Sequence, residues 1–99
     1  MNYHRLGRTN FQVSPLGIGG GAFTGRFYGD VNRTAIIELI HYALGKGVNY
    51  IDTARGYLDS EKLIGEALAE WEEECYVATK IHAGATAEQA IEQFEVSRI

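Results

Sequence analysis

Three side chains in the second half of the chain, Asp52, Tyr57 and Lys80, combine into a candidate proton-donating unit. A phenol has a pKa of about 10 and is a poor acid at neutral pH, but a nearby ammonium stabilises its ionised form. A carboxylate behind the ammonium holds it in place and keeps it charged. Such a unit suits general acid catalysis at a carbonyl oxygen that becomes negative as hydride arrives. Because no side chain delivers hydride, the unit implies a nicotinamide cofactor.

Taken singly, each of these side chains has an ordinary structural explanation. An aspartate after a strand caps a helix, a lysine there adds surface charge, and a tyrosine packs as an aromatic residue. The chemical interpretation therefore requires elements that bring Asp52, Tyr57 and Lys80 to one place.

The required elements are predicted by glycines, capping residues and apolar periodicity. Segments 3–6 and 11–13 flank a turn at residues 7–10, where glycine and asparagine allow positive φ, so residues 1–14 are predicted to form a hairpin. Helix signals follow in three segments. The first has Asn32 as an N-cap, an apolar stripe that includes Ile36, Ile40 and Leu44, and Gly47 as the stop. The second has Ser60 as an N-cap and a stripe of Ile64, Leu68 and Trp71. The third begins with a capping box at residues 86–89.

Short strands are predicted at residues 16–19, before the first helix, and at residues 48–52 and 75–79, between the helices. Alternating strands and helices argue for a parallel sheet in an α/β fold. Asp52 ends the second strand, Lys80 follows the third, and Tyr57 lies in the loop after Asp52, so all three are expected at the carboxyl ends of the strands. The strands recur about every 30 residues, as in an eight-unit (β/α) barrel, and the chain is long enough for about three units.

A glycine-rich segment follows the first predicted strand. Residues 17–22 match the pattern G-x-G-x-x-A of a dinucleotide fingerprint, which needs a strand before it and a helix directly after it. Pro15 disturbs the strand, and Gly25 and Gly29 disfavour the helix. Residues 20–30 are therefore predicted to be a loop whose bare backbone admits a flat ligand, and a loop without a ligand remains the alternative.

Composition excludes several other classes of protein. The 99 residues carry a net charge of −4, with five Lys/Arg against two Asp/Glu in residues 1–50 and four against eleven in residues 51–99. An acidic chain without a basic stripe is a poor candidate for nucleic-acid binding. Cys75 is the single cysteine, which excludes a disulfide framework and a multi-thiolate metal site and fits a reducing compartment. With no apolar run of membrane-spanning length and no signal-peptide pattern, we expect a cytoplasmic protein without a metal site.

The residues that carry the candidate chemistry also carry a family resemblance. Residues 49–57 (NYIDTARGY) with residues 60–68 (SEKLIGEAL) resemble the signature of the aldo/keto reductases. Residues 3–9 and 13–19 resemble that family's amino-terminal hairpin and first strand, and residues 78–80 resemble the end of its third strand. The resemblance covers essentially the whole chain.

The resemblance implies a (β/α)8 TIM barrel that binds NADP(H) at its mouth and reduces aldehydes or ketones with an Asp-Tyr-Lys-His tetrad. Asp52, Tyr57 and Lys80 match the first three members. The resemblance further implies that Asp52, together with the loop matched by Gly20 and Gly21, contacts the nicotinamide end of the cofactor.

Two departures from the family pattern stand out. The tetrad histidine follows the family's fourth strand, which lies beyond residue 99, and His82 does not match it. Leu58 stands where members commonly have glycine, and we expect it to reshape the loop while the phenol is kept. Residues 1–99 are therefore predicted to be a partial reductase domain, completed by the rest of the same chain or by a complementing chain.

Two other hypotheses remain open at this point. The chain is an inactive truncated product or a partner-dependent interaction module, or it is a regulatory relative that keeps cofactor binding. For residues 1–99 alone we expect an unstable monomer without reductase activity, because open sheet edges and uncovered helix faces invite pairing or aggregation. The substrate itself is not encoded in these residues, because the family's later loops shape its pocket.

Overall fold

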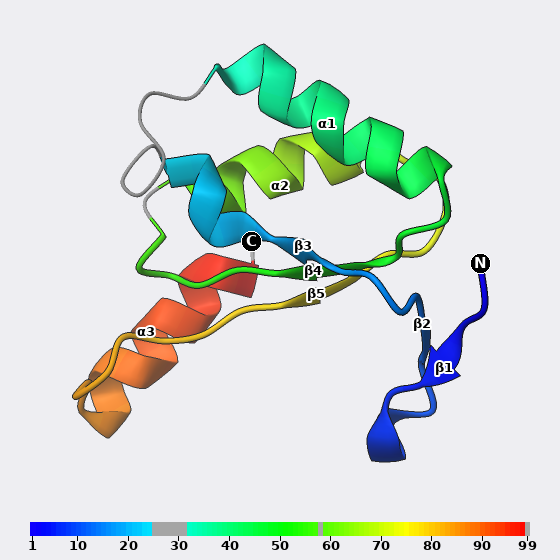
Figure 1. The fold of residues 1–99 in the computed structure, drawn as a ribbon. Coiled ribbons are helices and arrows are strands. Elements are labelled where there is room, and N and C mark those ends of the chain that lie inside the picture. The colour runs from blue at the N-terminus through cyan, green and yellow to red at the C-terminus, as the bar shows by residue number, and fades with distance from the viewer. Residues whose placement is uncertain (25–31, 58, 99) are drawn as a thin grey trace.

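A parallel three-stranded sheet forms the centre of the molecule (Figure 1). The structure, a computed structural model, describes residues 1–24, 32–57 and 59–98. The strands pair in chain order: β3 (Ile18–Gly19), β4 (Tyr50–Asp52) and β5 (Tyr76–Ala78). Gly19, Asp52 and Ala78 are aligned across the sheet. The predicted α/β fold with parallel strands is confirmed, and each strand is shorter than its predicted segment.

Within the described residues, three α-helices accompany the sheet: α1 (Arg33–Gly45), α2 (Ser60–Ala69) and α3 (Ala87–Arg98). Helices α1 and α2 pack together over one face of the sheet, whereas α3 lies beyond β5, on the other side of the strands in the view of Figure 1. The chain therefore runs from strand to helix through each of its three parallel strands, as the alternating pattern predicts.

The core lies between the sheet and the two helices α1 and α2. Its buried residues are Phe23, Ile36, Ile40, Leu44, Ile51, Leu63, Ile64 and Ala67. Ile51 of the central strand is fully buried, as is Ile40 at the middle of α1. The predicted stripe of α1 is confirmed, because residues one turn apart share the face that meets the sheet.

Helix ends follow the predicted capping chemistry in α1 and α3. The Asn32 side chain accepts a hydrogen bond from the Ala35 N–H at 3.0 Å, and Gly47 follows α1 with a φ of 102°. At α3, the Thr86 hydroxyl accepts from the Gln89 N–H at 3.2 Å, and the Gln89 side chain accepts from the Thr86 N–H at 2.9 Å. The reciprocal pair is the predicted capping box.

The start of α2 differs from the prediction. Asp59 is the N-cap, and Ser60 is the first helical residue. The Ser60 hydroxyl is fully buried and hydrogen-bonded to the Thr53 hydroxyl at 2.7 Å, so it ties α2 to the end of β4 instead of capping the helix. Trp71 lies after the end of α2 and packs against the core from there.

The amino-terminal hairpin lies at the opposite end of the strands from the candidate site (Figure 1). Strands β1 (His4–Arg5) and β2 (Gln12–Val13) pair antiparallel, and the turn between them contains a short 3-10 helix, η1 (Gly7–Thr9). Gly7 and Asn10 have φ values of 50° and 63°, as predicted for this turn.

Side-chain contacts on Asn49 and Tyr76 help to join the hairpin to the rest of the chain. Asn49, just before β4, donates to the Gln12 carbonyl and accepts from the Ser14 N–H, both at 2.8 Å. The Phe11 ring stacks on the Tyr76 ring with centroids 4.3 Å apart. The hairpin therefore covers the amino ends of β4 and β5.

The glycine-rich segment is only partly a loop. Residues 20–24 form a second 3-10 helix, η2 (Gly20–Thr24), because Phe23 is buried in the core and draws the backbone against α2. The rest of the predicted loop, residues 25–31, lies outside the described residues. In the part of the chain that the structure describes, no helix is long and apolar enough to cross a membrane.

Candidate active site

The ion pair predicted between two neighbouring strand ends is present. The Lys80 ammonium donates to the Asp52 carboxylate at 2.9 Å and to the Thr53 backbone carbonyl at 2.8 Å. Asp52 ends β4, and Lys80 follows β5, its pairing partner. The register of two adjacent parallel strands thus places the charges side by side.

The pair keeps the ammonium charged. The hydrogen bond to Asp52 raises the pKa of Lys80 above its ordinary value, and partial burial opposes that effect. The negative charge of Asp52 and, with smaller effect, the ionised forms of Tyr57 and Tyr50 raise it further. Lys80 is therefore a cation at neutral pH with a carboxylate behind it.

Tyr57 lies beside this cation. The Lys80 ammonium is 5.3 Å from the centroid of the Tyr57 ring, within the range of a cation–π contact. The Tyr57 backbone is held in a compact turn, because its N–H donates to the Ala54 carbonyl at 3.1 Å and its own carbonyl accepts from the Ser60 N–H at 2.9 Å. The structure thus brings all three predicted residues together at one edge of the sheet.

The two glycines singled out for the cofactor lie in η2, next to this group. A methyl group added at Gly20 would lie 2.6 Å from the Ser60 hydroxyl and 3.1 Å from the Asp52 carbonyl, so tight packing alone requires glycine there. A methyl group at Gly21 would meet the Tyr57 ring at 3.7 Å, an ordinary contact distance. Gly20 is thus a packing position, whereas Gly21 lies beside the Tyr57 ring with room for a methyl group.

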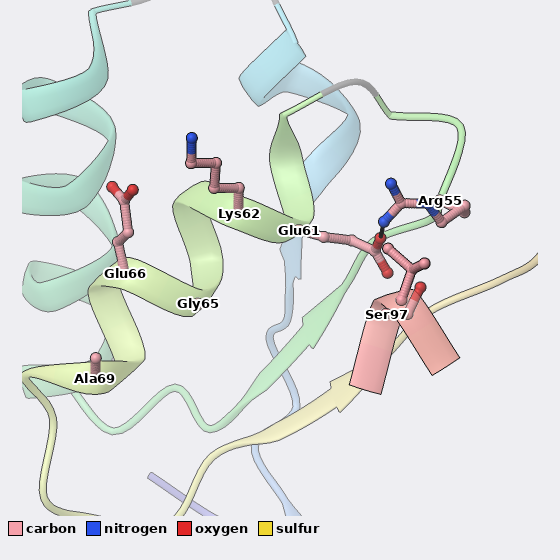
Figure 2. Close-up of a pocket in the computed structure, with 8 residues that line it drawn as sticks. Arg55, Glu61, Lys62, Gly65, Glu66, Ala69 and Ser97 are labelled. Atoms are coloured by element: carbon pink, nitrogen blue, oxygen red, sulfur yellow. Dashed lines mark hydrogen bonds and ion pairs between the residues drawn. The ribbon is translucent and has the colours of Figure 1, made fainter. Parts of the chain in front are cut away.

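A second polar cluster, which the sequence reasoning missed, adjoins the site. Glu61 in the first turn of α2 forms an ion pair with Arg55 at 2.5 Å and accepts a hydrogen bond from the Thr79 hydroxyl at 2.7 Å. Glu61 and Arg55 are both part of the family signature, and their opposite charges are the signal that could have paired them. Figure 2 shows Glu61 extending from α2 toward Arg55 and the end of α3.

A pocket of about 580 Å³ lies beside this cluster, between α2 and the last turn of α3 (Figure 2). Arg55, Glu61 and Ser97 contribute to its wall, together with side chains along α2. None of the three predicted catalytic residues lines it. The pocket is therefore separate from the group of Asp52, Tyr57 and Lys80.

Among the remaining candidates that the structure describes, His82 and Cys75 form no contact with this group that the structure records. His82 lies against Gly56, since a methyl group at that glycine would be 3.2 Å from the imidazole, and Leu58 lies outside the described residues. Burial raises the pKa of the half-buried Cys75 thiol to about 11, which makes it a weak nucleophile. The described residues contain no group of three or more His, Cys, Asp or Glu side chains arranged to hold a metal ion.

Fold and site together define a class of protein: an α/β protein whose polar residues gather at the carboxyl ends of parallel strands, where such folds place their ligands. The chain belongs to the aldo/keto reductase family, because the model of that family matches residues 15–99. The resemblance of the signature segments is thereby confirmed, and with it membership of a family of oxidoreductases.

Individual relatives agree with this assignment. Aldo-keto reductase YhdN of Bacillus subtilis is 33% identical over 84 residues, covering 81% of this chain and 25% of that protein. The NADH-specific methylglyoxal reductase of Escherichia coli is 40% identical over 67 residues, covering 64% of this chain and 21% of that protein. A solved structure from Pseudomonas aeruginosa, described as an aldo-keto reductase, superposes with a TM-score of 0.81 at 30% identity, covering 96% of this chain and 40% of that chain.

The chain spans about a quarter of the length of the curated relatives it matches. It covers 40% of the matched solved structure, so that structure extends well beyond it.

Proposed function

We propose that residues 1–99 form the amino-terminal part of a (β/α)8 barrel enzyme that uses NADP(H) to reduce aldehydes or ketones to alcohols. The observation that carries the proposal is the Lys80 ammonium, which is 2.9 Å from the Asp52 carboxylate and 5.3 Å from the centroid of the Tyr57 ring. An ion-paired ammonium beside a phenol is what general acid catalysis at a carbonyl oxygen needs. The remainder of the barrel comes from the same chain or from a complementing chain.

Each of the three residues has a distinct role in this proposal. The Tyr57 hydroxyl donates a proton to the substrate's carbonyl oxygen, which would otherwise become an alkoxide. The Lys80 ammonium stabilises the negative charge that remains on the phenol, and Asp52 holds Lys80 in position and ionised. The proton passes from the Tyr57 hydroxyl to the substrate's carbonyl oxygen. Tyr57 is therefore the residue to test first.

The residues around the site fit a nicotinamide cofactor, which when bound supplies the hydride. The Asp52 and Lys80 side chains are 45% and 50% exposed, so their polar atoms are open to a ligand. Gly21 presents bare backbone next to the Tyr57 ring. We assign Asp52 and Gly21 to cofactor contact, with the buried Gly20 shaping the turn that brings Gly21 there.

The preference for NADPH over NADH needs a direct comparison, since one relative is named as NADH-specific. Fluorescence titration of the complete protein with NADPH and with NADH provides this comparison. Tighter binding of NADPH supports the proposed cofactor, and tighter binding of NADH replaces it with the other nicotinamide.

The catalytic proposal is tested with Tyr57→Phe in the complete natural protein that contains this chain. NADPH consumption is followed with a panel of small aldehydes and ketones, including methylglyoxal. We expect kcat to fall by about 100-fold or more, the usual contribution of a general acid, while cofactor binding is unchanged. The matched control is Tyr42→Phe, since Tyr42 is an exposed tyrosine on α1. Equal activity of the Tyr57 variant would remove the proposed role of the phenol.

A second candidate function is a partner-dependent module without activity of its own. It is favoured by the apolar side chains Ile91, Phe94 and Val96, which α3 leaves exposed. The intact mass of the natural protein in its source cells separates the two candidates. A mass several times that of residues 1–99 supports the reductase, whereas a mass near that of these residues supports the module.

A further inference from the structure

The loop between β4 and α2 carries Tyr57, and few backbone contacts connect it to the strand that precedes Lys80. The Thr53 N–H donates to the Ala78 carbonyl at 2.8 Å, and the Arg55 N–H donates to the Lys80 carbonyl at 2.9 Å. Beyond Arg55 the hydrogen bonds of the Tyr57 backbone stay within its own turn. The position of the phenol relative to the ammonium therefore depends on how firmly Arg55, and with it the turn that carries Tyr57, is held against this strand end.

One carboxylate connects both sides of this arrangement. Oε1 of Glu61 pairs with Nη1 of Arg55 at 2.5 Å, and Oε2 accepts from the Thr79 hydroxyl at 2.7 Å. Arg55 lies two residues before Tyr57, and Thr79 directly precedes Lys80. Each oxygen of Glu61 thus binds a neighbour of one member of the phenol–ammonium pair (Figure 2 shows the Arg55 side).

The Glu61 side chain is largely buried and ionised. Its side chain is 13% exposed, whereas that of Arg55 is 32% exposed. Burial by itself raises the pKa of Glu61, but hydrogen bonds from Thr79, Ser97 and Arg55 and the guanidinium charge together hold the pKa below its usual value. A carboxylate that stays ionised can accept from Arg55 and Thr79 at once, and such charge-assisted bonds are stronger than neutral ones.

We propose that Glu61 is a positioning residue that holds the loop bearing Tyr57 against the strand end bearing Lys80 and so sets the alignment of the proton donor. The proposal rests on the proposed function above, because alignment of these two groups matters only if they act together. Glu61 itself does not touch the reacting atoms. It acts through Arg55 on one side and Thr79 on the other.

The same helix offers a matched control. Glu66 also lies on α2 and also forms an ion pair with an arginine, Arg33 at the start of α1. Figure 2 shows Glu66 on the side of α2 that faces α1, away from Arg55. Glu66→Gln therefore removes the same charge from the same helix without touching the loop that carries Tyr57.

The test compares Glu61→Gln with Glu66→Gln in the complete natural protein. An amide keeps the shape of Glu61 but removes its charge, so the ion pair with Arg55 is lost even where the amide still contacts the Thr79 hydroxyl. We expect Glu61→Gln to lower kcat by about tenfold or more with unchanged NADPH affinity, since small misplacements of reacting groups are costly. Amide hydrogen exchange at Arg55 and Tyr57 should become faster at the same time. Glu66→Gln should change neither quantity.

The two readouts separate the possible failures. Wild-type kcat and unchanged exchange in Glu61→Gln would overturn the positioning role. Faster exchange in Glu61→Gln, with no turnover by the wild-type protein, would support the proposed effect of Glu61 on the loop and contradict the reductase proposal. Faster exchange with wild-type kcat would show a structural contact without the proposed effect on alignment, and it would also overturn the inference.

A milder pair of variants covers the case in which Glu61→Gln fails to fold. Thr79→Val removes the hydroxyl and keeps a β-branched side chain of the same size, whereas Thr79→Ser keeps the hydroxyl donor. We expect the valine variant to lose part of kcat, about threefold to tenfold by the same misalignment, and the serine variant to restore most of it. Equal kcat in the two variants would count against the proposal.

Discussion

Lys80 is held by two acceptors of different kinds, and this decides how it responds to pH. The Asp52 carboxylate and the Thr53 carbonyl both accept hydrogen bonds from its ammonium, at 2.9 Å and 2.8 Å. The carbonyl orients the ammonium, but only the carboxylate adds a negative charge. Removing that charge should therefore change the ionisation of Lys80 more than its position.

Replacing Asp52 by Asn tests this separation. The hydrogen bond to Asp52 is the largest effect on the pKa of Lys80 and raises it, so the wild-type ammonium stays charged to higher pH than an ordinary lysine. In Asp52→Asn that increase is lost, and the fall in kcat at alkaline pH should begin at lower pH than in the wild-type protein. A pH–rate profile of both proteins, with saturating cofactor, measures the shift. An alkaline limb at the same pH in both would contradict this assignment.

At the scale of elements, the site depends on how closely η2 approaches the end of β4 and the start of α2. Gly20 lies where a side chain would collide with the Ser60 hydroxyl and with the Asp52 backbone. Gly21, the next residue, has room for a methyl group beside the Tyr57 ring. The two neighbouring glycines therefore have different physical reasons for being small.

This difference predicts opposite outcomes for two alanine variants of the complete protein. Gly20→Ala should lower the free energy of unfolding by about 1–3 kcal/mol, the usual cost of overpacking a buried site. Gly21→Ala should leave the free energy of unfolding nearly unchanged, and any effect should appear in cofactor binding. Chemical denaturation and cofactor titration of both variants measure these quantities. Equal loss of stability in the two variants would show that the packing argument is wrong.

At the scale of the whole molecule, the described residues leave much apolar surface uncovered. Among them, β3 and β5 each pair with a neighbour on one side, and α3 exposes more than half of the side chains of Ile91, Phe94 and Val96. Unpaired strand edges and contiguous apolar faces favour association with another chain or segment. The matched solved structure, of which this chain covers 40%, is long enough to contain elements that cover such surfaces.

Residues 1–99 expressed alone are therefore expected to associate or aggregate and to show no NADPH turnover. Size-exclusion chromatography and an activity assay, run beside the complete protein, check both statements. A monomeric 99-residue chain with a cooperative unfolding transition and measurable turnover would contradict the prediction.

The sequence predicted elements better than it predicted their ends and contacts. The helix signals at Asn32, Gly47 and Thr86 were correct because capping is local and uses hydrogen bonds within a few residues. The prediction that Ser60 caps α2 was wrong, because its hydroxyl is hydrogen-bonded to Thr53, directly after β4. The predicted loop at residues 20–30 begins as a 3-10 helix because Phe23 enters the core.

By itself the sequence determined the order of strands and helices, the family, and the meeting of Asp52 with Lys80, because parallel strands must bring their carboxyl ends to one edge. Only the tertiary structure decided that Glu61 joins Arg55 to Thr79 and that Gly20 is a packing position. Periodicity and capping act over a few residues and can be found in a sequence. Contacts between side chains of different elements depend on how α2 and η2 pack against the sheet, and the packing of the core sets that geometry.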